Sequence, residues 1–303
     1  MKTVIIGAGA MGSLFGGLLT EAGADVWMLD VWKEHVEVLQ KEGLSIEWEG
    51  CTRIIPVNAT TDMHKPGKAD LIIIFVKSLH TQVAADTAAA LLAEHGVILT
   101  LQNGMGNADI LAETVGGRQV LAGTTAHGAT LLGPGCIRHA GKATTCIGMW
   151  REGDSHPAAR VADFLTQAAI QTDMVEEIRP IVWNKLLVNI GINSITALTS
   201  IQNGQLLDLP QTRALSAAAV AEAAAVAEAQ GIHVATDMVE QTFAIAKSTA
   251  SNRSSMGQDV DALRPTEISA INGFIVREAK RLGIDAPVNR TLTTLIETLQ
   301  AHY

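Results

Sequence analysis

Three polar side chains recur at four-residue intervals in an otherwise apolar stretch near the middle of the chain. Lys185, Asn189 and Asn193 follow Pro180, which can occupy the first turn of a helix without removing a hydrogen bond that the helix needs. Four residues advance a helix by about 400°, so the three side chains share one face and apolar residues cover the others. An ammonium and two amides buried in such a helix are costly unless a polar ligand pairs with them. The stretch therefore predicts a ligand site; the alternative is a core helix with one lysine that reaches solvent.

A second motif, rich in glycine, lies near the start of the chain. The β-branched run from Lys2 to Ile6 predicts a strand, and the apolar pattern that ends near Gly23 predicts a helix. Between them stands G-x-G-x-x-G, in which the first glycine permits a tight turn, the second lets a pyrophosphate approach the backbone, and the third lets helix and strand pack closely. The free N–H groups of the helix also attract phosphate. We predict a dinucleotide-binding loop, rather than a purely structural turn, from Gly7, Ala8, Gly9, Ala10, Met11 and Gly12.

Asp30 follows the second predicted strand, Asp25 to Leu29, and lies 18 residues after Gly12. A carboxylate at this place accepts hydrogen bonds from the adenosine ribose hydroxyls and repels a 2′-phosphate. Asp30 therefore favours NAD(H) over NADP(H). Two alternatives stay open: Lys33 could bind a 2′-phosphate, and Asp30 could instead cap the next helix.

Two more polar residues follow predicted parallel strands. Lys77 comes after the apolar run Leu71 to Val76, and Asn103 comes after the run Val97 to Leu101. Ligands of open α/β sheets bind beyond the carboxyl ends of the strands. Lys77 could therefore attract a phosphate or a carboxylate, and Asn103 could hold the nicotinamide or the substrate. The alternatives are a solvated lysine and an asparagine that only forms an Asn-Gly turn.

These motifs require a sheet and a helical region to position them, and the sequence pattern changes accordingly along the chain. Strand patterns alternate with helical patterns in the first part, whereas only helical patterns follow Pro180. We predict an α/β, Rossmann-type N-terminal domain with a mostly parallel sheet at residues 1–176. An all-α C-terminal domain is predicted at residues 177–303.

Local patterns within these domains give further expectations. Leu44 to Trp48 and Arg53 to Val57 predict a hairpin. The strands on either side of residues 133–135, with the run Thr144 to Gly148 behind them, predict antiparallel additions to the parallel sheet. Glu267 is expected in the first turn of a helix from Ile268 to Leu282, where an acid is usually only a partner of the helix dipole.

The composition limits the class of protein. Hydrophobic residues make up 48% and charged residues 17% of the 303 residues, which indicates a globular chain. The net charge of −9 argues against binding to nucleic acid or to anionic membranes, since both depend on clustered Lys and Arg. Three cysteines without a CxxC spacing indicate reduced thiols and a cytoplasmic location. The nine histidines lack metal-ligand spacing, so we predict no metal; the oligomeric state stays open, a homodimer included.

Together these motifs resemble the ketopantoate reductases (2-dehydropantoate 2-reductases) along nearly the whole chain. The glycine motif is generic, whereas the Lys-Asn-Asn helix and the spacing from SSMGQD to TEI are specific. The blocks that carry the resemblance are GAGAMG at 7–12, VKS at 76–78, QNGMG at 102–106, GTTAHGA at 123–129, WNKLLVNIGINSITAL at 183–198, NRSSMGQD at 252–259, PTEISAINGF at 265–274 and APVN at 286–289.

The resemblance implies a Rossmann domain and a helical domain with the active site between them. It also implies a nicotinamide cofactor and the reduction of ketopantoate, a small 2-oxo acid, to pantoate in pantothenate and coenzyme A biosynthesis. Lys185 would be the general acid that protonates the ketone oxygen, Glu267 would bind the substrate hydroxyl, and Lys77 would lie near the cofactor or the carboxylate. A half-buried lysine should have a lowered pKa, which Glu267 would oppose. The substrate would be held by Asn103, Asn189, Asn193, Asn252 and Ser255.

One position departs from the family. Its members usually use NADP(H) and have a basic residue just after the second strand, where this chain has Asp30-Val31-Trp32-Lys33. The family default is thus NADP(H), while Asp30 favours NAD(H). Two alternative functions follow. One is an NAD-dependent D-2-hydroxyacid dehydrogenase acting on another 2-oxo acid; the other is a non-catalytic nucleotide-sensing module, which accounts poorly for the Lys-Asn-Asn face.

Overall fold

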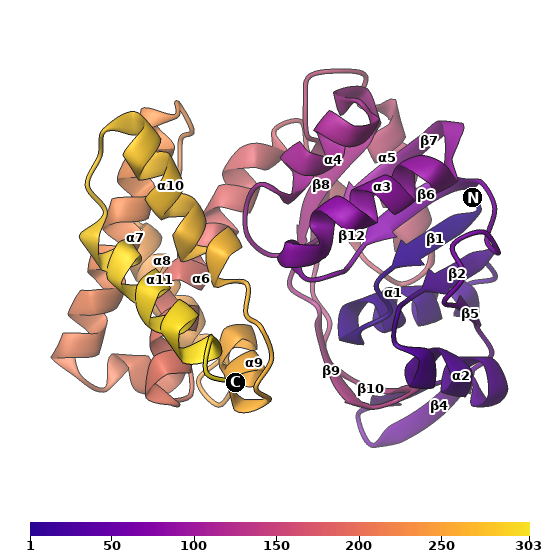
Figure 1. Cartoon of the computed structure of the whole chain (residues 1–303), viewed down its shortest axis with the longest axis horizontal. Coiled ribbons are helices and arrows are strands. Elements are labelled where there is room, and N and C mark those ends of the chain that lie inside the picture. Colours follow the sequence, from indigo (N-terminus) through magenta and orange to yellow (C-terminus); the bar gives the residue numbers. More distant parts are fainter. The chain divides into compact units, whose positions relative to one another are not determined.

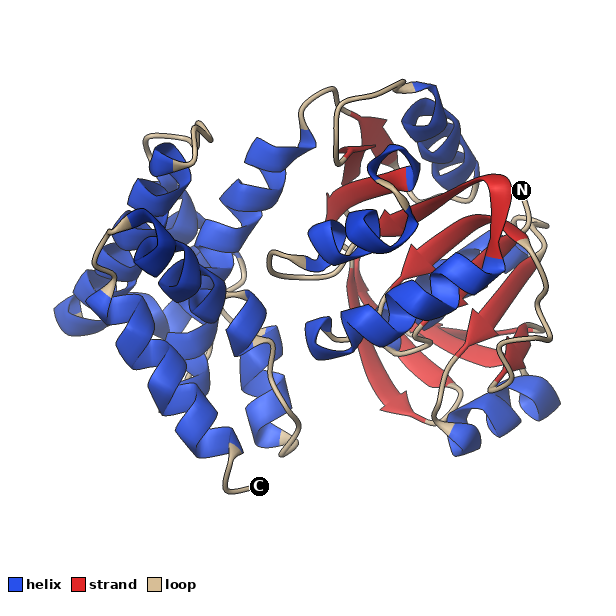
Figure 2. Ribbon diagram, turned by 45° about the horizontal axis from the view of Figure 1, so that its top comes forward, coloured by secondary structure: helices blue, strands red, loops and turns tan.

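A computed structural model describes all 303 residues and divides the chain into two compact units (Figure 1). The sheet unit consists of residues 1–102 and 107–178, and the helical unit consists of residues 103–106 and 179–303. Every strand belongs to the sheet unit (Figure 2). Residues 103–106 thus pack with the helical unit, although the chain on both sides of them belongs to the sheet unit.

An eight-stranded sheet with the order β12-β11-β8-β7-β6-β1-β2-β5 forms the centre of the sheet unit. The strands from β8 to β5 in this order are parallel to their neighbours, and β11 is antiparallel to β8. The predicted Rossmann-type domain with a mostly parallel sheet is confirmed. The strands are β1 Thr3–Ile6, β2 Val26–Leu29, β5 Asn58–Thr60, β6 Ala69–Ile74, β7 Leu92–Thr100, β8 Val120–Thr125, β11 Thr145–Met149 and β12 Thr172–Met174.

Helices cover both faces of this sheet. They are α1 Ala10–Glu21, α2 Lys33–Glu42, α3 Thr81–Leu91, α4 Asn107–Val115 and α5 His156–Gln167, with the short 3-10 turns η1 Ser78–His80 and η2 Gly117–Gln119. α3 and α4 pack against each other and against β6, β7 and β8, whereas α1 packs against β1 and β2 and α2 packs against β5. Because the central strands are covered on both faces, the apolar run Leu71 to Ile74 of β6 is continuous and fully buried.

A second, four-stranded sheet packs against α1. Its strands, in the order β4-β3-β10-β9, are β3 Leu44–Trp48, β4 Cys51–Ile55, β9 Gly128–Gly133 and β10 Cys136–Gly141. Two adjacent glycines let both sheets approach the same helix. A Cβ at Gly16 would lie 2.7 Å from Sδ of Met28 in β2, and a Cβ at Gly17 would lie 2.7 Å from Cδ2 of Leu44 in β3. α1 is therefore an interior helix between two sheets.

This second sheet corrects one expectation from the sequence. The β3–β4 hairpin is confirmed, with Glu49 and Gly50 both at positive φ, as a two-residue type I′ turn requires. The strands on either side of residues 133–135 also pair antiparallel, but β10 pairs in parallel with β3 and does not join the parallel sheet. The prediction was right for the run Thr144 to Gly148, because β11 pairs antiparallel with β8 in the large sheet. It was wrong for β9 and β10, because an alternating pattern shows that a strand is half-buried without showing which sheet it joins.

α6 (Ile178–Thr199) is the central helix of the helical unit, and Pro180 lies in its first turn. Trp183, Leu187 and Ile190 are fully buried in it. By length and composition alone α6 could cross a membrane, but 61% of its most apolar window is buried inside the protein, as in a core helix. The predicted all-α character of this region is confirmed. Its other helices are α7 Pro210–Ala229, α8 Met238–Ser248, α9 Ser255–Asp261, α10 Asn272–Leu282 and α11 Pro287–Gln300, with the 3-10 turns η3 Gly204–Leu207 and η4 Ile268–Ala270.

The helix expected from Ile268 to Leu282 is interrupted, because η4 and α10 replace it. The carbonyl of Ala270 accepts a hydrogen bond from the N–H of Met105 at 2.9 Å, and a Cβ at Gly104 would lie 2.6 Å from the same oxygen. The 103–106 loop thus satisfies a carbonyl that a continuous helix would have used itself. No local sequence pattern predicts such a contact, so the expectation of one unbroken helix was wrong.

Close packing around α6 gives a stability prediction. A Cβ at Gly191 would lie 2.7 Å from Cγ2 of Thr242 in α8 and 2.8 Å from Cγ2 of Val220 in α7. Gly191→Ala should therefore lower the free energy of unfolding by about 1–3 kcal/mol in urea denaturation. Ala225→Gly, on the exposed side of α7, measures the opposing backbone preference for alanine, which is about 0.5–1 kcal/mol. Unchanged or increased stability of Gly191→Ala would contradict the tight packing.

Candidate functional site

The glycine motif lies where the order of the parallel strands reverses. β1 leads through α1 to β2, whereas β6 leads through α3 to β7 on the opposite side of the sheet. Ligands of doubly wound sheets bind in the crevice at such a switch point. A Cβ added to Gly7, which follows β1, would lie 2.7 Å from the backbone nitrogen of Val76, which follows β6. The glycine loop and the segment that leads to Lys77 therefore lie side by side at this edge.

Each glycine of the motif has the conformation or the free space that was expected of it. Gly7 has a φ of 96°, which residues with a side chain rarely adopt. A Cβ at Gly12 would overlap the carbonyl oxygen of Gly7, so helix and turn can pack this closely only around glycine. A Cβ at Gly9 would meet nothing within 4 Å. The backbone just before α1 is thus open to a phosphate, and the free N–H groups of the first turn suit an anion.

Asp30 binds the glycine loop directly. Its Oδ2 accepts a hydrogen bond from the N–H of Ala8 at 2.6 Å, and its Oδ1 accepts one from the N–H of Trp32 at 2.9 Å. An ionised carboxylate has about four acceptor sites, so capacity remains for ribose hydroxyls. Asp30 does not cap the next helix, since Trp32 is the N-cap residue of α2. Lys33, the first residue of α2, is exposed.

Ser13 and His35, which no sequence motif singles out, hold the same loop. Ser13 Oγ donates a hydrogen bond to the carbonyl of Ala8 at 2.7 Å and lies 3.4 Å from His35 Nε2. The N–H of Gly135 donates to His35 Nδ1 at 2.9 Å, so the neutral ring carries its proton on Nε2. Burial lowers the pKa of His35 and favours this neutral form, although Asp30 opposes the shift. No local signal could select His35, because Gly135 lies 100 residues away.

In the helical unit, the continuous helix α6 places Lys185, Asn189 and Asn193 on one face, as predicted. Asn193 is buried, and Lys185 and Asn189 are half-buried. Fully buried apolar side chains flank them along the helix. The three polar side chains are thus buried or half-buried and do not form a fully solvated face.

Glu267 and Asn103 come to Lys185 from segments far apart in the sequence. Glu267 is only 7% exposed, and its charge acts on the Lys185 ammonium. Asn103 Nδ2 donates a hydrogen bond to Glu267 Oε2 at 3.3 Å. Asn103 reaches this place because the contact between Met105 and Ala270 anchors its loop beside η4. The structure therefore brings together three of the residues selected for chemistry.

The position of Lys185 alters its acidity. Burial lowers the pKa of Lys185 from 10.5 to about 8, and the Glu267 carboxylate opposes this shift. Both the direction and the opposing charge agree with the expectation from the sequence. Near neutral pH the ammonium is still protonated, yet it releases its proton more readily than an exposed lysine does. These are the properties of a general acid.

Other selected residues lie elsewhere. Asn252 is exposed in the loop before α9, and Ser255 is exposed in the first turn of α9. Lys77 is half-buried in the sheet unit, directly before η1. His127 is a buried histidine whose Nδ1 lies 3.3 Å from Nε2 of His139. No group of three or more His, Cys, Asp or Glu side chains is arranged to hold a metal ion.

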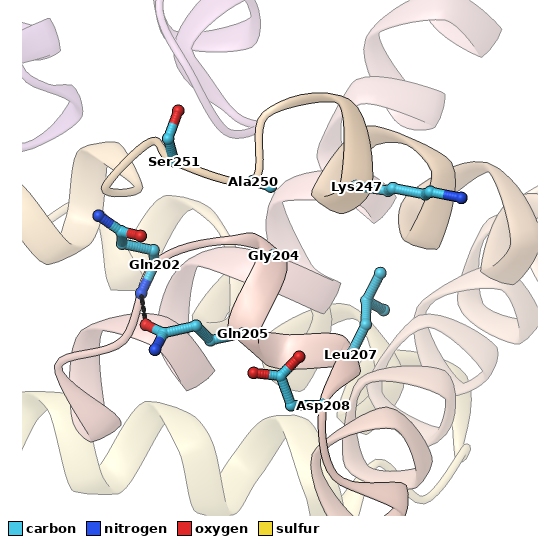
Figure 3. Close-up of a pocket in the computed structure, with 8 residues that line it drawn as sticks. All are labelled: Gln202, Gly204, Gln205, Leu207, Asp208, Lys247, Ala250 and Ser251. Atoms are coloured by element: carbon cyan, nitrogen blue, oxygen red, sulfur yellow. Dashed lines mark hydrogen bonds between the residues drawn. The ribbon is translucent and has the colours of Figure 1, made fainter.

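A cavity of about 430 Å³ opens beside η3 and the end of α8 (Figure 3). None of the residues selected for chemistry lines it, and its charged side chains, Asp208 and Lys247, are exposed. The residues selected for chemistry thus form two groups, the glycine loop of the sheet unit and the group of Lys185, Glu267 and Asn103 in the helical unit. The cavity is lined by Gln202, Gly204, Gln205, Leu207, Asp208, Lys247, Ala250 and Ser251.

Comparison with known proteins agrees with these features. The 2-dehydropantoate 2-reductase of Halobacterium salinarum is 38% identical over 301 residues, with 99% of each chain covered. The 2-dehydropantoate 2-reductase of Pyrococcus horikoshii is 36% identical over 303 residues, with 99% of this chain and 98% of the relative covered. The chain belongs to the ketopantoate reductase family. The family model described as ketopantoate reductase PanE/ApbA matches residues 3–152, and the model of its C-terminal part matches residues 177–300.

Solved structures share the ketopantoate reductase fold along the whole chain. A PanE/ApbA family ketopantoate reductase from Ralstonia eutropha has a TM-score of 0.92 and 31% identity, with 100% of this chain and 99% of the other covered. A D-mandelate dehydrogenase, solved as a ternary complex with NADH and anilino(oxo)acetate, has a TM-score of 0.94 and 28% identity at the same coverage. The fold is therefore similar to that of enzymes named for two different substrates.

The charge of Glu267 can be tested on the pKa of its neighbour. Glu267→Gln should lower the pKa of Lys185 below about 8, because burial still disfavours the ammonium and the opposing carboxylate is gone. An NMR titration of the Lys185 side chain, assigned with Lys185→Arg, measures this shift. Glu228→Gln removes an exposed carboxylate from α7 and should leave the pKa unchanged. A pKa in Glu267→Gln equal to or above that of the unaltered protein would contradict the pairing.

Proposed function

We propose that this protein is a nicotinamide-dependent 2-oxo acid reductase of the 2-dehydropantoate 2-reductase type, which reduces ketopantoate to pantoate. The observation that carries the proposal is the group formed by Lys185, whose pKa is lowered by burial, with Glu267 and its partner Asn103. The chain also matches relatives named for this reaction along 99% of its length. Pantoate is a precursor of pantothenate and coenzyme A, so the reaction belongs to their biosynthesis. We place it in the cytoplasm, since the three cysteines are free thiols.

Reduction of the ketone adds a hydride to its carbon and a proton to its oxygen. A bound nicotinamide cofactor supplies the hydride and is oxidised. Lys185 Nζ donates the proton as negative charge develops on the oxygen, and the neutral amine then takes a proton from solvent. Glu267 keeps Lys185 protonated before the reaction and accepts a hydrogen bond from the substrate hydroxyl. The substrate is held by the polar side chains of Asn103, Asn189, Asn193, Asn252 and Ser255.

The residues of the sheet unit fit a dinucleotide. The open backbone at Gly9 and the first turn of α1 suit its pyrophosphate, and Lys77 adds a cation near the same edge. Asn103 is the residue we assign to the nicotinamide end. Asp30, hydrogen-bonded to Ala8 of the loop, suits the ribose hydroxyls and repels a 2′-phosphate. We therefore propose NAD(H) as the preferred cofactor, although the family default is NADP(H).

Lys185 gives the main test of the reaction. Lys185→Ala should lower kcat for ketopantoate about 10²–10⁴-fold, because the general acid is lost, and should leave the Kd of NADH unchanged. In the unaltered enzyme kcat should be constant below pH about 8 and fall above it, since only the protonated lysine can donate. Lys247→Ala, an exposed lysine in the same unit, serves as the control.

Two outcomes of this experiment would count against the proposal. The unaltered protein is expected to oxidise NADH or NADPH in the presence of ketopantoate, and failure with both would remove the reductase assignment. Full activity of Lys185→Ala would remove Lys185 as the acid. A protein that binds NADH without any turnover would instead support the nucleotide-sensing module.

The cofactor preference can be tested at Asp30. Asp30→Asn keeps a side chain of the same size but removes the charge, so the ratio of the NADPH and NADH dissociation constants should fall about tenfold, which corresponds to about 1.4 kcal/mol. Glu34→Gln removes one charge from the exposed first turn of α2 and is the matched control. Titration of both cofactors by fluorescence gives the constants. Tighter binding of NADPH than NADH by the unaltered protein would contradict the assignment of Asp30.

A second candidate function is an NAD-dependent D-2-hydroxyacid dehydrogenase that acts on another 2-oxo acid. It is favoured by Asp30 and by the similarity to D-mandelate dehydrogenase, which was solved with NADH. A comparison of kcat/KM for ketopantoate and for phenylglyoxylate, a bulky aromatic 2-oxo acid, separates the two functions. A higher value for phenylglyoxylate would favour the dehydrogenase, and an equal or higher value for ketopantoate would favour the reductase.

A further inference from the structure

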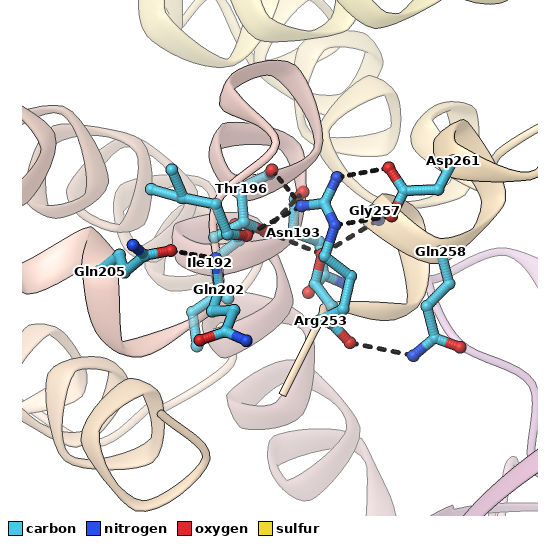
Figure 4. A network of polar contacts seen from close by, with 11 residues as sticks. Ile192, Asn193, Thr196, Gln202, Gln205, Arg253, Gly257, Gln258 and Asp261 are labelled. Atoms are coloured by element: carbon cyan, nitrogen blue, oxygen red, sulfur yellow. Dashed lines mark hydrogen bonds and ion pairs between the residues drawn. The ribbon is translucent and has the colours of Figure 1, made fainter. Parts of the chain in front are cut away.

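Arg253 connects the loop before α9 to the C-terminal end of α6 (Figure 4). Its Nη1 donates hydrogen bonds to the carbonyls of Thr196 at 2.5 Å and Ile201 at 2.8 Å. Its Nε and Nη2 donate to the two carboxylate oxygens of Asp261, each at 2.8 Å. The carbonyl of Thr196 is among the last four of α6, which have no partner inside the helix. The guanidinium therefore satisfies the end of α6 and places a cation at its negative pole.

Neighbouring residues strengthen this connection. The hydroxyls of Thr196 and Ser254 share a hydrogen bond of 2.8 Å, and Ser254 Oγ also accepts the N–H of Gly257 at 3.1 Å as the cap of α9. The carbonyl of Asn252 accepts the N–H of Asn203 at 2.9 Å. The whole loop before α9 is thus tied to the end of α6 through both its backbone and its side chains.

The guanidinium packs against α9 at a position where a larger residue would displace it. A Cβ at Gly257 would lie 2.7 Å from both Cζ and Nη1 of Arg253. The Arg253 side chain is only 18% exposed, and its hydrogen bond with Asp261 lowers the pKa of that carboxyl. An arginine near an anionic substrate usually binds the carboxylate directly in a bidentate manner. Here the bidentate partner is Asp261, so the guanidinium is already committed to the protein.

We propose that Arg253, in the space that Gly257 leaves, is a positioning residue that sets the affinity for the 2-oxo acid substrate. It holds Asn252 and Ser255 at a defined place relative to Asn193, which lies one turn before Thr196 on α6. Arg253 itself does not bind the substrate. This inference rests on the proposed function, since Asn193, Asn252 and Ser255 are the groups assigned to substrate binding.

Two substitutions test the contact from its two sides. Arg253→Met removes the guanidinium. Gly257→Ala keeps the guanidinium but pushes it away from its partners. Apart from this contact, alanine is preferred to glycine in a helix, so the backbone of α9 should tolerate the change. Each should raise KM for ketopantoate about tenfold, the equivalent of one lost charged hydrogen bond. We expect kcat to change less than about twofold and the Kd of NADH to stay the same, because the proton donor and the glycine loop are untouched.

The double variant separates positioning from a general loss of stability. Because both changes act through one contact, Arg253→Met combined with Gly257→Ala should raise KM no further than Arg253→Met alone. Arg290→Met removes an exposed arginine of α11 whose ion-pair partner Asp285 is also exposed, and it is the matched charge control, with no expected change in KM. Asp261→Asn leaves the two Nη1 bonds in place and should raise KM only slightly. It keeps the test available if Arg253→Met does not fold.

Several results would overturn the inference. These are an unchanged KM in both single variants, KM increases that multiply in the double variant, or a fall in kcat with no change in KM. Unaltered protein that does not reduce ketopantoate would remove the proposed function and this inference with it. Normal turnover by the unaltered protein, together with variants whose KM is unaffected, would remove the inference alone.

Discussion

A cation held inside a largely apolar helix is the constraint on which the arrangement of the helical unit depends. Burial alone would drive Lys185 towards its neutral form, and the Glu267 carboxylate limits the fall of its pKa to about 8. Glu267 is itself buried and requires a polar partner, which Asn103 provides. Asn103 can reach it only because residues 103–106 leave the sheet unit and bond to Ala270. The break between η4 and α10 therefore belongs to the same network as Lys185.

The glycine loop of the sheet unit is held in a comparable way by side chains from outside the motif. Asp30 binds the N–H of Ala8, and Ser13 binds the carbonyl of the same residue, with His35 behind it. Both backbone polar groups of Ala8 are thus engaged, while the backbone at Gly9 stays open. A loop held in this manner loses little conformational freedom when a ligand binds, which favours affinity.

The two wrong expectations about the fold share a physical origin. The alternation around residues 133–135 correctly indicated a pair of antiparallel strands, but their sheet is decided by α1, an interior helix with glycines on two sides. The pattern from Ile268 to Leu282 correctly indicated helical residues, but the Met105 hydrogen bond interrupts them. In both places a partner distant in the sequence decided between arrangements that local preferences allow equally.

The sequence by itself determined those features of the protein that depend only on residues close together along the chain. The strand–glycine–helix motif, the buried parallel strands and the alignment of Lys185, Asn189 and Asn193 follow from periodicity and from the conformational freedom of glycine. The order of the motifs was also enough to indicate the ketopantoate reductase family. Only the tertiary structure decided that Glu267 acts on Lys185 and bonds to Asn103, and that Arg253 ties the loop before α9 to α6. Hydrogen bonds and charges act through space, so their partners can be separated by any number of residues along the chain.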